Sequence, residues 1–212
     1  TKDIGSSSVR FANGYFDTLY GDGSNLTGIS AGVTSDSQYN TVAGTNAGDN
    51  FQSTNAVGNT LYGFDAGTDI TEGDYNTLIG YQAGKNITTG SWNTLIGRLC
   101  GQAITTGGSN VALGNYIYEK LTTGSNNIGI GHNSLLSLTS GQNNVAIGSD
   151  SLNAVNASKN SVAVGFEALK NNQKEGNVGI GYNSGLNNIH GTYNTYIGYD
   201  SGPSIGQPSL AN

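Results

Sequence analysis

Residues 76–97 read NTLIGYQAGKNITTGSWNTLIG, so the phrase Asn-Thr-Leu-Ile-Gly occurs twice, 17 residues apart. Related phrases continue in both directions, and their closing glycines are separated by 19 residues, then by 17 six times, then by 16 and 17. Self-similarity at a short fixed period is the sequence signature of a repeat architecture. The chain is therefore predicted to be a repeat protein. The closing glycines are Gly44, Gly63, Gly80, Gly97, Gly114, Gly131, Gly148, Gly165, Gly181 and Gly198.

The composition is typical of strands and turns. Glycine supplies 34 of the 212 residues, and charged residues supply only 10%, against about 25% in typical globular proteins. Short runs of Val, Ile, Leu and Tyr alternate with Gly, Asn, Ser and Thr, which favours short strands joined by tight turns. The net charge of −6 predicts no nucleic-acid binding, because phosphate contacts require clustered Lys and Arg. No apolar run approaches the ~18 residues of a membrane-spanning helix, so we expect no membrane insertion.

Numbering each repeat from its asparagine gives positions with a recurrent chemistry. Position one is Asn except at Ser161, positions two and four are mostly Thr or branched aliphatic residues, and position five is the glycine. This alternation predicts a strand over positions two to four. Position eight is small and position twelve apolar, which predicts a second short strand. A strand with a crossover helix needs more than 17 residues, so we predict an all-β, parallel β-solenoid (β-roll) of about ten 17-residue coils.

Two positions are expected to form structural ladders along the solenoid. Asparagine side chains would bond to the asparagines of the coils above and below. The glycines suit a turn that needs positive φ, or a close approach of two backbones, at every level. The predicted ladder residues are Asn76, Asn93, Asn110, Asn127 and Asn144, with Gly80, Gly97, Gly114, Gly131 and Gly148.

The strand positions predict two covered faces. Positions two and four share one face of a strand, which we assign to the interior of the coil. Position three lies on the opposite face and is also mostly apolar or small. Because a long exposed apolar stripe usually marks an interface, we predict a neighbouring chain on this second face. The residues assigned to a trimer interface are Leu61, Leu78, Leu95, Ala112, Ala146 and Ala163.

The repeats divide the chain into three segments. Residues 1–39 lack the repeat and combine aromatic residues with Asn-Gly and Asp-Gly turn signals, so we expect an N-terminal cap or attachment segment. Residues 40–202 are predicted to form the solenoid. Residues 203–212 contain both prolines and are predicted to end it, because proline cannot donate a ladder hydrogen bond.

The phrases Asn144-Val-Ala-Ile-Gly148 and Ser161-Val-Ala-Val-Gly165 resemble the head repeat of trimeric autotransporter adhesins of the YadA type, and are similar to related repeats in bacteriophage tail fibres. The resemblance extends over residues 40–202, although the period is longer than is common in that family. It implies a homotrimer of parallel β-rolls, left-handed in each protomer. A second phrase, Gly21-Asp-Gly-Ser-Asn-Leu-Thr-Gly-Ile29, resembles sequences in structural and fibre proteins of tailed phages. It favours a phage fibre over a bacterial adhesin.

No residue pattern predicts catalysis, a metal or a cofactor. His132 and His190 stand at different positions of different repeats, and Cys100, the only cysteine, excludes an internal disulfide. Asp150 and Glu167 share one position of adjacent coils, which leaves open a polysaccharide depolymerase, because glycosidases use paired carboxylates. A further alternative is an ice-binding solenoid. Its threonine column would be Thr71, Thr88, Thr105 and Thr122.

Aromatic residues in turns are the stronger indication of a ligand. Tyr75, Trp92 and Tyr193 stand just before a repeat boundary, where a host glycan could stack on them. The competing interpretation is that they hold successive coils or protomers together.

These patterns predict a structural fibre protein at the surface of a bacteriophage virion, without enzymatic activity or cofactors. Its expected partners are two further copies of itself, other virion proteins, and a glycan or protein of the host surface. The alternative is the head of a trimeric adhesin at a bacterial cell surface.

Overall fold

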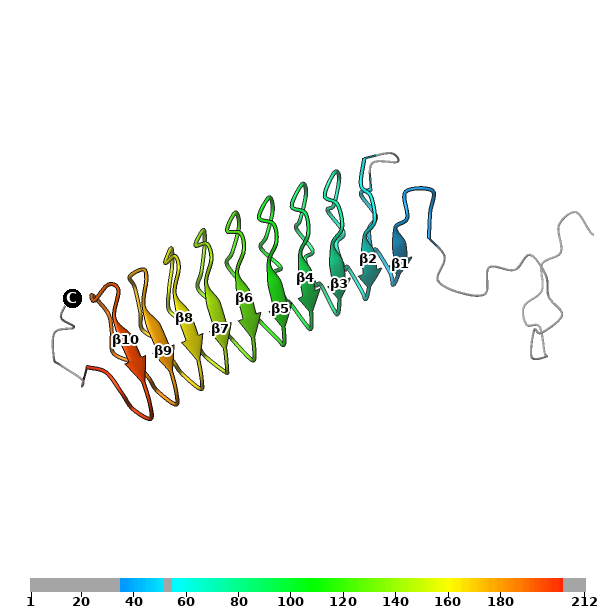
Figure 1. Ribbon diagram of the computed structural model, residues 1–212. Helices are drawn as coiled ribbons and strands as arrows, with labels where there is room; N and C mark the ends of the chain where they lie inside the picture. The colour runs from blue at the N-terminus through cyan, green and yellow to red at the C-terminus, as the bar shows by residue number, and fades with distance from the viewer. Residues whose placement is uncertain (1–34, 52–54, 204–212) are drawn as a thin grey trace, which may run out of the picture. The chain divides into compact units, whose positions relative to one another are not determined.

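The computed structural model describes residues 35–51 and 55–203. They belong to the compact unit Val33–Asn212, and the other unit, Thr1–Gly32, lies outside the described residues. Ten strands of three residues each form one parallel sheet in sequence order (Figure 1). The strands are β1 (Thr41–Ala43), β2 (Thr60–Tyr62), β3 (Thr77–Ile79), β4 (Thr94–Ile96), β5 (Val111–Leu113), β6 (Ile128–Ile130), β7 (Val145–Ile147), β8 (Val162–Val164), β9 (Val178–Ile180) and β10 (Thr195–Ile197).

The predicted all-β parallel β-solenoid is confirmed, with about nine turns of about 17 residues between β1 and β10. Strands pair in register, so residues at one position of the repeat stack on one another, as Leu78 does on Leu95. The stacking continues around the turns, where the Trp92 amide donates to the Asp74 carbonyl at 2.9 Å. One repeat is therefore one coil of the solenoid.

The predicted second strand of each coil is wrong. The residues after the position-five glycine form consecutive turns and bends in the described coils. The cause is the backbone conformation, because positions seven and nine both have positive φ, as at Gln82 (55°) and Gly84 (57°). Left-handed residues so close together curl the chain, whereas a strand needs extended backbone throughout.

The assignment of the two strand faces is also wrong, because they are reversed. Position three points into the coil, and its predicted interface residues are buried within a single chain. Positions two and four point outward, and Leu113 is 48% exposed. The buried asparagine at position one gives the reason, because positions one and three share a strand face. The side chains that therefore do not face a neighbouring chain are Leu61, Leu78, Leu95, Ala112, Ala146 and Ala163.

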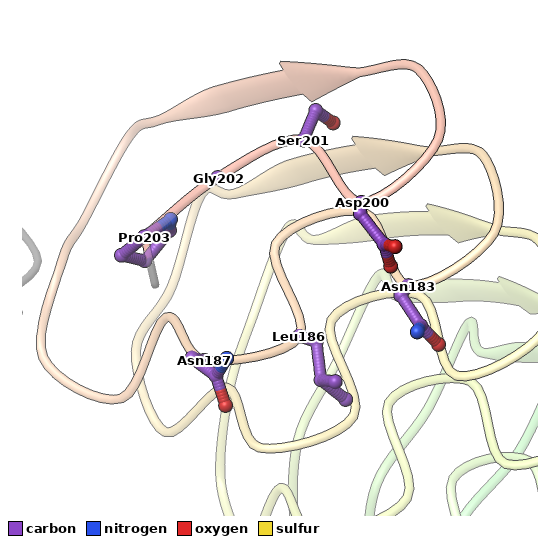
Figure 2. A pocket seen from close by; sticks show the side chains of 7 residues that line it. All are labelled: Asn183, Leu186, Asn187, Asp200, Ser201, Gly202 and Pro203. Carbon is purple, nitrogen blue, oxygen red and sulfur yellow. The ribbon is translucent and has the colours of Figure 1, made fainter. Parts of the chain in front are cut away.

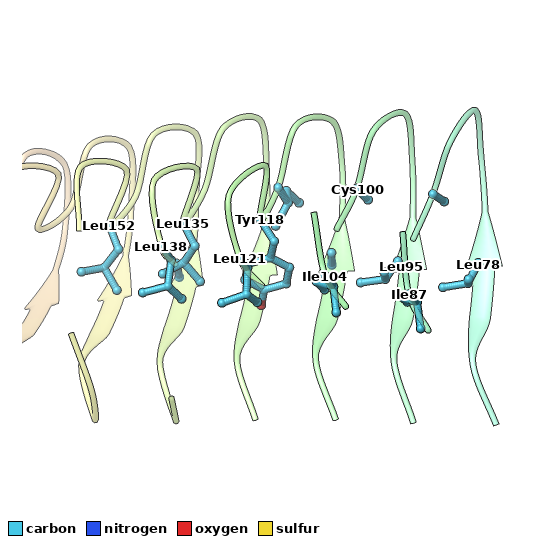
Figure 3. Close-up of a cluster of buried hydrophobic side chains, with 14 of the residues drawn as sticks. Leu78, Ile87, Leu95, Cys100, Ile104, Tyr118, Leu121, Leu135, Leu138 and Leu152 are labelled. Atoms are coloured by element: carbon cyan, nitrogen blue, oxygen red, sulfur yellow. The ribbon is translucent and has the colours of Figure 1, made fainter. Parts of the chain in front are cut away.

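The interior is filled in two different ways along the chain (Figure 3). In the coils of β2–β4, here the strand-filled region, position three is Leu and position nine is Gly. In the coils of β5–β8, the turn-filled region, position three is Ala or Gly and position nine is large. The large side chain thus comes from the strand in one region and from the turn in the other. The position-nine residues are Gly67, Gly84 and Gly101, followed by Tyr118, Leu135, Leu152 and Leu169.

Position twelve completes the core and changes character near the C-terminal end. It becomes Asn172 and Asn188, which are buried like the apolar residues they replace. Asn172 Oδ1 accepts hydrogen bonds from Asn177 Nδ2 (2.9 Å) and Asn188 Nδ2 (3.2 Å), so the amides are paired inside the coil. The apolar residues at this position are Ile70, Ile87, Ile104, Leu121, Leu138 and Val155.

Asp36 closes the N-terminal end of the asparagine column. Asn40 Nδ2 donates to Asp36 Oδ2 (3.0 Å), and the Asn40 amide donates to Asp36 Oδ1 (2.8 Å). Asp36 thus supplies the acceptors that a preceding coil would otherwise offer. The rest of the predicted cap, up to residue 34, lies outside the described residues.

Candidate interaction surfaces

The asparagine column is a buried ladder. Its side-chain donors are satisfied from Asn40 to Asn177, whereas Asn194 Nδ2 has no partner among the described residues. Asn76 Nδ2 donates to Asn59 Oδ1 of the preceding coil (3.1 Å) and to the Gly90 carbonyl of its own coil (2.9 Å). The Asn76 amide donates to the same Asn59 Oδ1 at 2.9 Å. The ladder therefore fixes the register of the coils and leaves no group for a ligand. The same pattern recurs at Asn93, Asn110, Asn127 and Asn144.

Ser161 interrupts the ladder, and local residues repair it. The Ser161 amide still donates to Asn144 Oδ1 (3.1 Å), but serine offers no carboxamide to the next coil. Asn177 Nδ2 donates instead to Asn172 Oδ1. The buried amide at position twelve therefore replaces the acceptor that the serine removes.

The position-five glycines have φ values between 120° and 142°, a region that side-chain-bearing residues almost never occupy. A Cβ at Gly80 would also overlap the Gly97 carbonyl oxygen of the next coil. Both facts give the column a structural role. They apply equally at Gly97, Gly114, Gly131 and Gly148.

The outward side of the sheet carries an apolar stripe, here called the outer strand face. From β5 to β9 both outward positions are Val, Ile or Leu, and none of these side chains is fully buried. An apolar stripe of this extent on a soluble protein usually marks an interface. The residues of the outer strand face are Val111, Leu113, Ile128, Ile130, Val145, Ile147, Val162, Val164, Val178 and Ile180.

Aromatic rings at position six, two residues after the strand, stack in two separate sets of adjacent coils. Phe64 and Tyr81 are parallel at 5.5 Å between centroids, and the Arg98 guanidinium lies 5.9 Å from the Tyr81 ring. Phe166, Tyr182 and Tyr199 form a second stack at 5.3 and 5.1 Å. The sequence interpretation missed these stacks, although the aromatic residues recur at one repeat position and could have indicated them.

The aromatic residues that were predicted to contact a glycan are exposed. Trp92 is 63% and Tyr193 64% exposed, and Tyr75 stacks on Trp92 with 6.3 Å between centroids. The structure brings Tyr75 and Trp92 together on adjacent coils, whereas Tyr193 lies several coils away. One ring pair therefore links coils, as the competing interpretation expected, while a large part of each ring remains accessible.

The residues considered for catalysis are held by their neighbours. Asp150 accepts hydrogen bonds from Asn153 (2.8 Å) and Asn133 (3.3 Å), and Glu167 pairs with Lys170 at 2.7 Å. No group of three or more potential metal ligands occurs among residues 35–51 and 55–203.

Cys100 lies at position eight inside the coil. Its Sγ–H donates to the Gly114 carbonyl at 2.6 Å, and burial raises the pKa of the thiol to about 11. A thiol of such high pKa is a poor nucleophile. The side chain fills the small space at this position.

The threonine column uses its hydroxyls within the solenoid. Thr88 Oγ1 donates to the Thr105 carbonyl of the next coil at 3.2 Å, and Thr71 and Thr105 make the same bond. Hydroxyl donors engaged in this way are not available to order water on an ice-binding face.

A cavity of about 320 Å³ lies at the last described coils (Figure 2). Its lining contains one carboxylate and neither a cationic side chain nor a sulfur or imidazole ligand. Such a lining offers no catalytic or metal-binding arrangement. The lining residues are Asn183, Leu186, Asn187, Asp200, Ser201, Gly202 and Pro203.

The fold defines the chain as a parallel β-solenoid. Comparisons with models of protein families, with curated proteins and with solved structures returned no match. Within the described part of the chain, no helix is long and apolar enough to cross a lipid bilayer.

Proposed function

We propose that this chain is a structural fibre segment of a bacteriophage virion and assembles as a homotrimer through its outer strand face. The outer strand face carries this proposal. It presents ten aliphatic side chains over five adjacent strands, and exposure of 37% at Val111 and Ile147 leaves much of that surface in water. Burial of apolar surface against further copies would stabilise both the coil and the assembly.

The number of copies and the virion location depend on resemblance. Three-fold symmetry follows from the likeness of the repeats to trimeric adhesin heads. The phrase at residues 21–29, which favours a phage, lies outside the described residues. A bacterial adhesin head would use the same outer strand face. The proposed role is mechanical and without catalysis, in keeping with the engaged carboxylates of Asp150 and Glu167.

The mass of the folded protein in solution tests the proposal. Light scattering should give three times the chain mass for the wild type. Leu113→Asp places a charge on the outer strand face and should lower the mass to that of one chain without loss of the β signal in circular dichroism. Thr89→Asp, at an exposed turn, should leave the trimer intact. A folded wild-type monomer would refute the proposed assembly.

A charge at Leu78 is not a test of the interface. Because Leu78 is buried in the coil, Leu78→Asp should unfold the chain whether or not it associates. The comparison of Leu113→Asp with Leu78→Asp therefore separates loss of assembly from loss of the fold.

A further inference from the structure

Position seventeen, the residue before each ladder asparagine, forms an exposed row along the edge where the chain enters the strands. All its residues from Tyr39 to Tyr193 have positive φ, between 55° and 73°. Asn and Gly adopt this conformation readily, whereas aromatic residues do so at a conformational cost. Tyr75 (55°) and Trp92 (59°) are thus less favourable choices than the asparagines elsewhere in the row. Folding alone does not account for them, since both are more than half exposed.

One face of the Trp92 indole is covered and the other is open. The Tyr75 ring lies over Gly58 of the preceding coil, 2.7 Å from where a Cβ of that glycine would be. Trp92 stacks on Tyr75 with an interplanar angle of 15°. The row then continues with Ser109, whose short side chain cannot cover an indole, and among the described residues Tyr75 is the only ring stacked on Trp92. The indole therefore presents a flat apolar platform to solvent.

The surface beyond this platform is polar and uncharged. Positions sixteen and seventeen of the next three coils are Gly108, Ser109, Ser125, Asn126, Gln142 and Asn143. The exposed Asn126 carboxamide makes no hydrogen bond within the described residues, while Asn143 Nδ2 donates to Asn160 Oδ1 at 3.1 Å. Successive coils rise by roughly 4.8 Å, so the amides recur at the scale of one sugar residue of an extended chain.

We propose that the edge formed by Trp92, Ser109, Asn126 and Asn143 binds a neutral oligosaccharide. The apolar C–H face of one sugar ring stacks on the open face of the indole, and hydroxyls of the following sugars exchange hydrogen bonds with the carboxamides. The absence of charged side chains at positions sixteen and seventeen from Ser91 to Asn143 favours a neutral glycan over an acidic one. This inference rests on the proposed role at a virion surface and names the host ligand that such a fibre would contact.

Trp92 is the only tryptophan, so its fluorescence reports directly on the proposed site. The wild-type protein is applied to an array of neutral and acidic bacterial-surface glycans, and the strongest neutral binder is titrated while indole emission is recorded. Saturable binding with a change in emission is expected. Binding to acidic glycans only, to protein only, or to none of the neutral glycans would overturn the inference.

Trp92→Asn is the decisive variant, because it restores the residue that the row uses at Asn126 and should fold at least as well as the wild type. Calorimetry should show affinity for the neutral glycan reduced by about tenfold or more. Tyr81→Ala, an exposed aromatic residue in the position-six stack, is the control and should bind normally. Unchanged affinity in Trp92→Asn would exclude the site. A trimer that binds no glycan refutes only this inference, whereas a glycan-binding monomer refutes the proposed fibre assembly.

Discussion

The strand-filled and turn-filled regions have the same backbone and the same register but place their large side chains at opposite walls of the coil. In the strand-filled region Leu78 crosses the interior toward Gly84, and in the turn-filled region Tyr118 crosses it toward Gly129 of the next coil. The comparison teaches that the coil requires a certain interior volume, not a particular residue at a particular position. Because protein interiors are close-packed, one large side chain must fill this volume, either from position three of the strand or from position nine of the turn.

The two regions differ in where strain is located. Gly84 adopts positive φ without strain, but Leu135 and Leu152 have φ of 52° and 47°, which is unfavourable for a side chain of that size. The turn-filled region tolerates this because the strained residue also fills the core. In the turn-filled region position three is small, and both outward positions of the strand are aliphatic. That region therefore carries most of the outer strand face.

Exchanging the two arrangements in one coil should have the largest effect. Leu78→Ala leaves a cavity and should reduce the free energy of unfolding by about 2–5 kcal/mol. Gly84→Leu should also destabilise, because a Cβ there lies 2.8 Å from Ile87 Cδ1 and 2.9 Å from Leu78 Cδ1. The double variant converts the coil to the turn-filled type and should be more stable than either single change. Urea unfolding at one protein concentration measures the three values. Additive losses would contradict the volume argument.

The difference in stability between a glycine and an alanine variant should be smaller than these effects and of opposite sign in the two regions. Leu135→Gly loses one more carbon atom from the core than Leu135→Ala does, but it relieves positive φ, so the glycine variant should be more stable by about 1 kcal/mol. At Leu78, in a strand, glycine should instead be less stable than alanine by roughly 0.5–1 kcal/mol. Thermal unfolding of the four variants tests the reversal. If alanine is the better replacement at both sites, strain does not distinguish the regions.

The smallest expected effect on stability comes from an ion pair. In the strand-filled region this pair joins two neighbouring coils, whereas the pair in the turn-filled region does not. Lys85 Nζ lies 2.8 Å from Asp65 Oδ2 on the neighbouring coil, whereas the Lys170–Glu167 pair is within one turn. Hydrogen bonds from Lys85 and then Asn46 lower the pKa of Asp65, although burial opposes them. Because the pKa of Asp65 is lower in the folded state, its carboxylate stabilises the fold at pH values above the unfolded pKa of about 3.9. This contribution is lost as the pH falls through the folded pKa.

Wild-type stability should therefore decrease as pH is lowered below about 4. Asp65→Asn should be less stable than the wild type at neutral pH and show a weaker decrease. Urea midpoints at a series of pH values give the comparison, with Asp49→Asn, an exposed carboxylate change, as the control. Equal pH profiles for the wild type and Asp65→Asn would remove the inter-coil pair as a source of stability.

The sequence was sufficient for the coil count, the parallel stacking and the two ladders, because Asn76 and Gly80 recur at a fixed period. The predicted orientation of the strand is wrong, since apolar residues occur on both faces and only the buried asparagine at position one distinguishes the inward face. The exchange between Leu78–Gly84 and Ala146–Leu152 is visible in the sequence as compensating volumes. The left-handed conformation of Leu152 is not, because it depends on packing that overrides local preference.

The site residues divide in the same way. The exposure of Trp92 and Tyr193 agrees with their placement in turns, because turns lie at the surface. The covered and open faces of the Trp92 indole could not be predicted, since they depend on which way Tyr75 leans across the neighbouring coil. Periodicity assigns a residue to a row, but which face of each ring is covered depends on side-chain packing between coils.

The asparagine ladder has a direction. From Asn59 to Asn144 each side-chain amide donates toward the N-terminal neighbour, as Asn93 does to Asn76 and Asn76 does to Asn59, and the column begins at Asp36. A completed coil thus displays a vacant carbonyl oxygen to the segment that follows it in the polypeptide. We expect each coil emerging from the ribosome to dock on the template left by the previous one, so the solenoid can be built vectorially during translation.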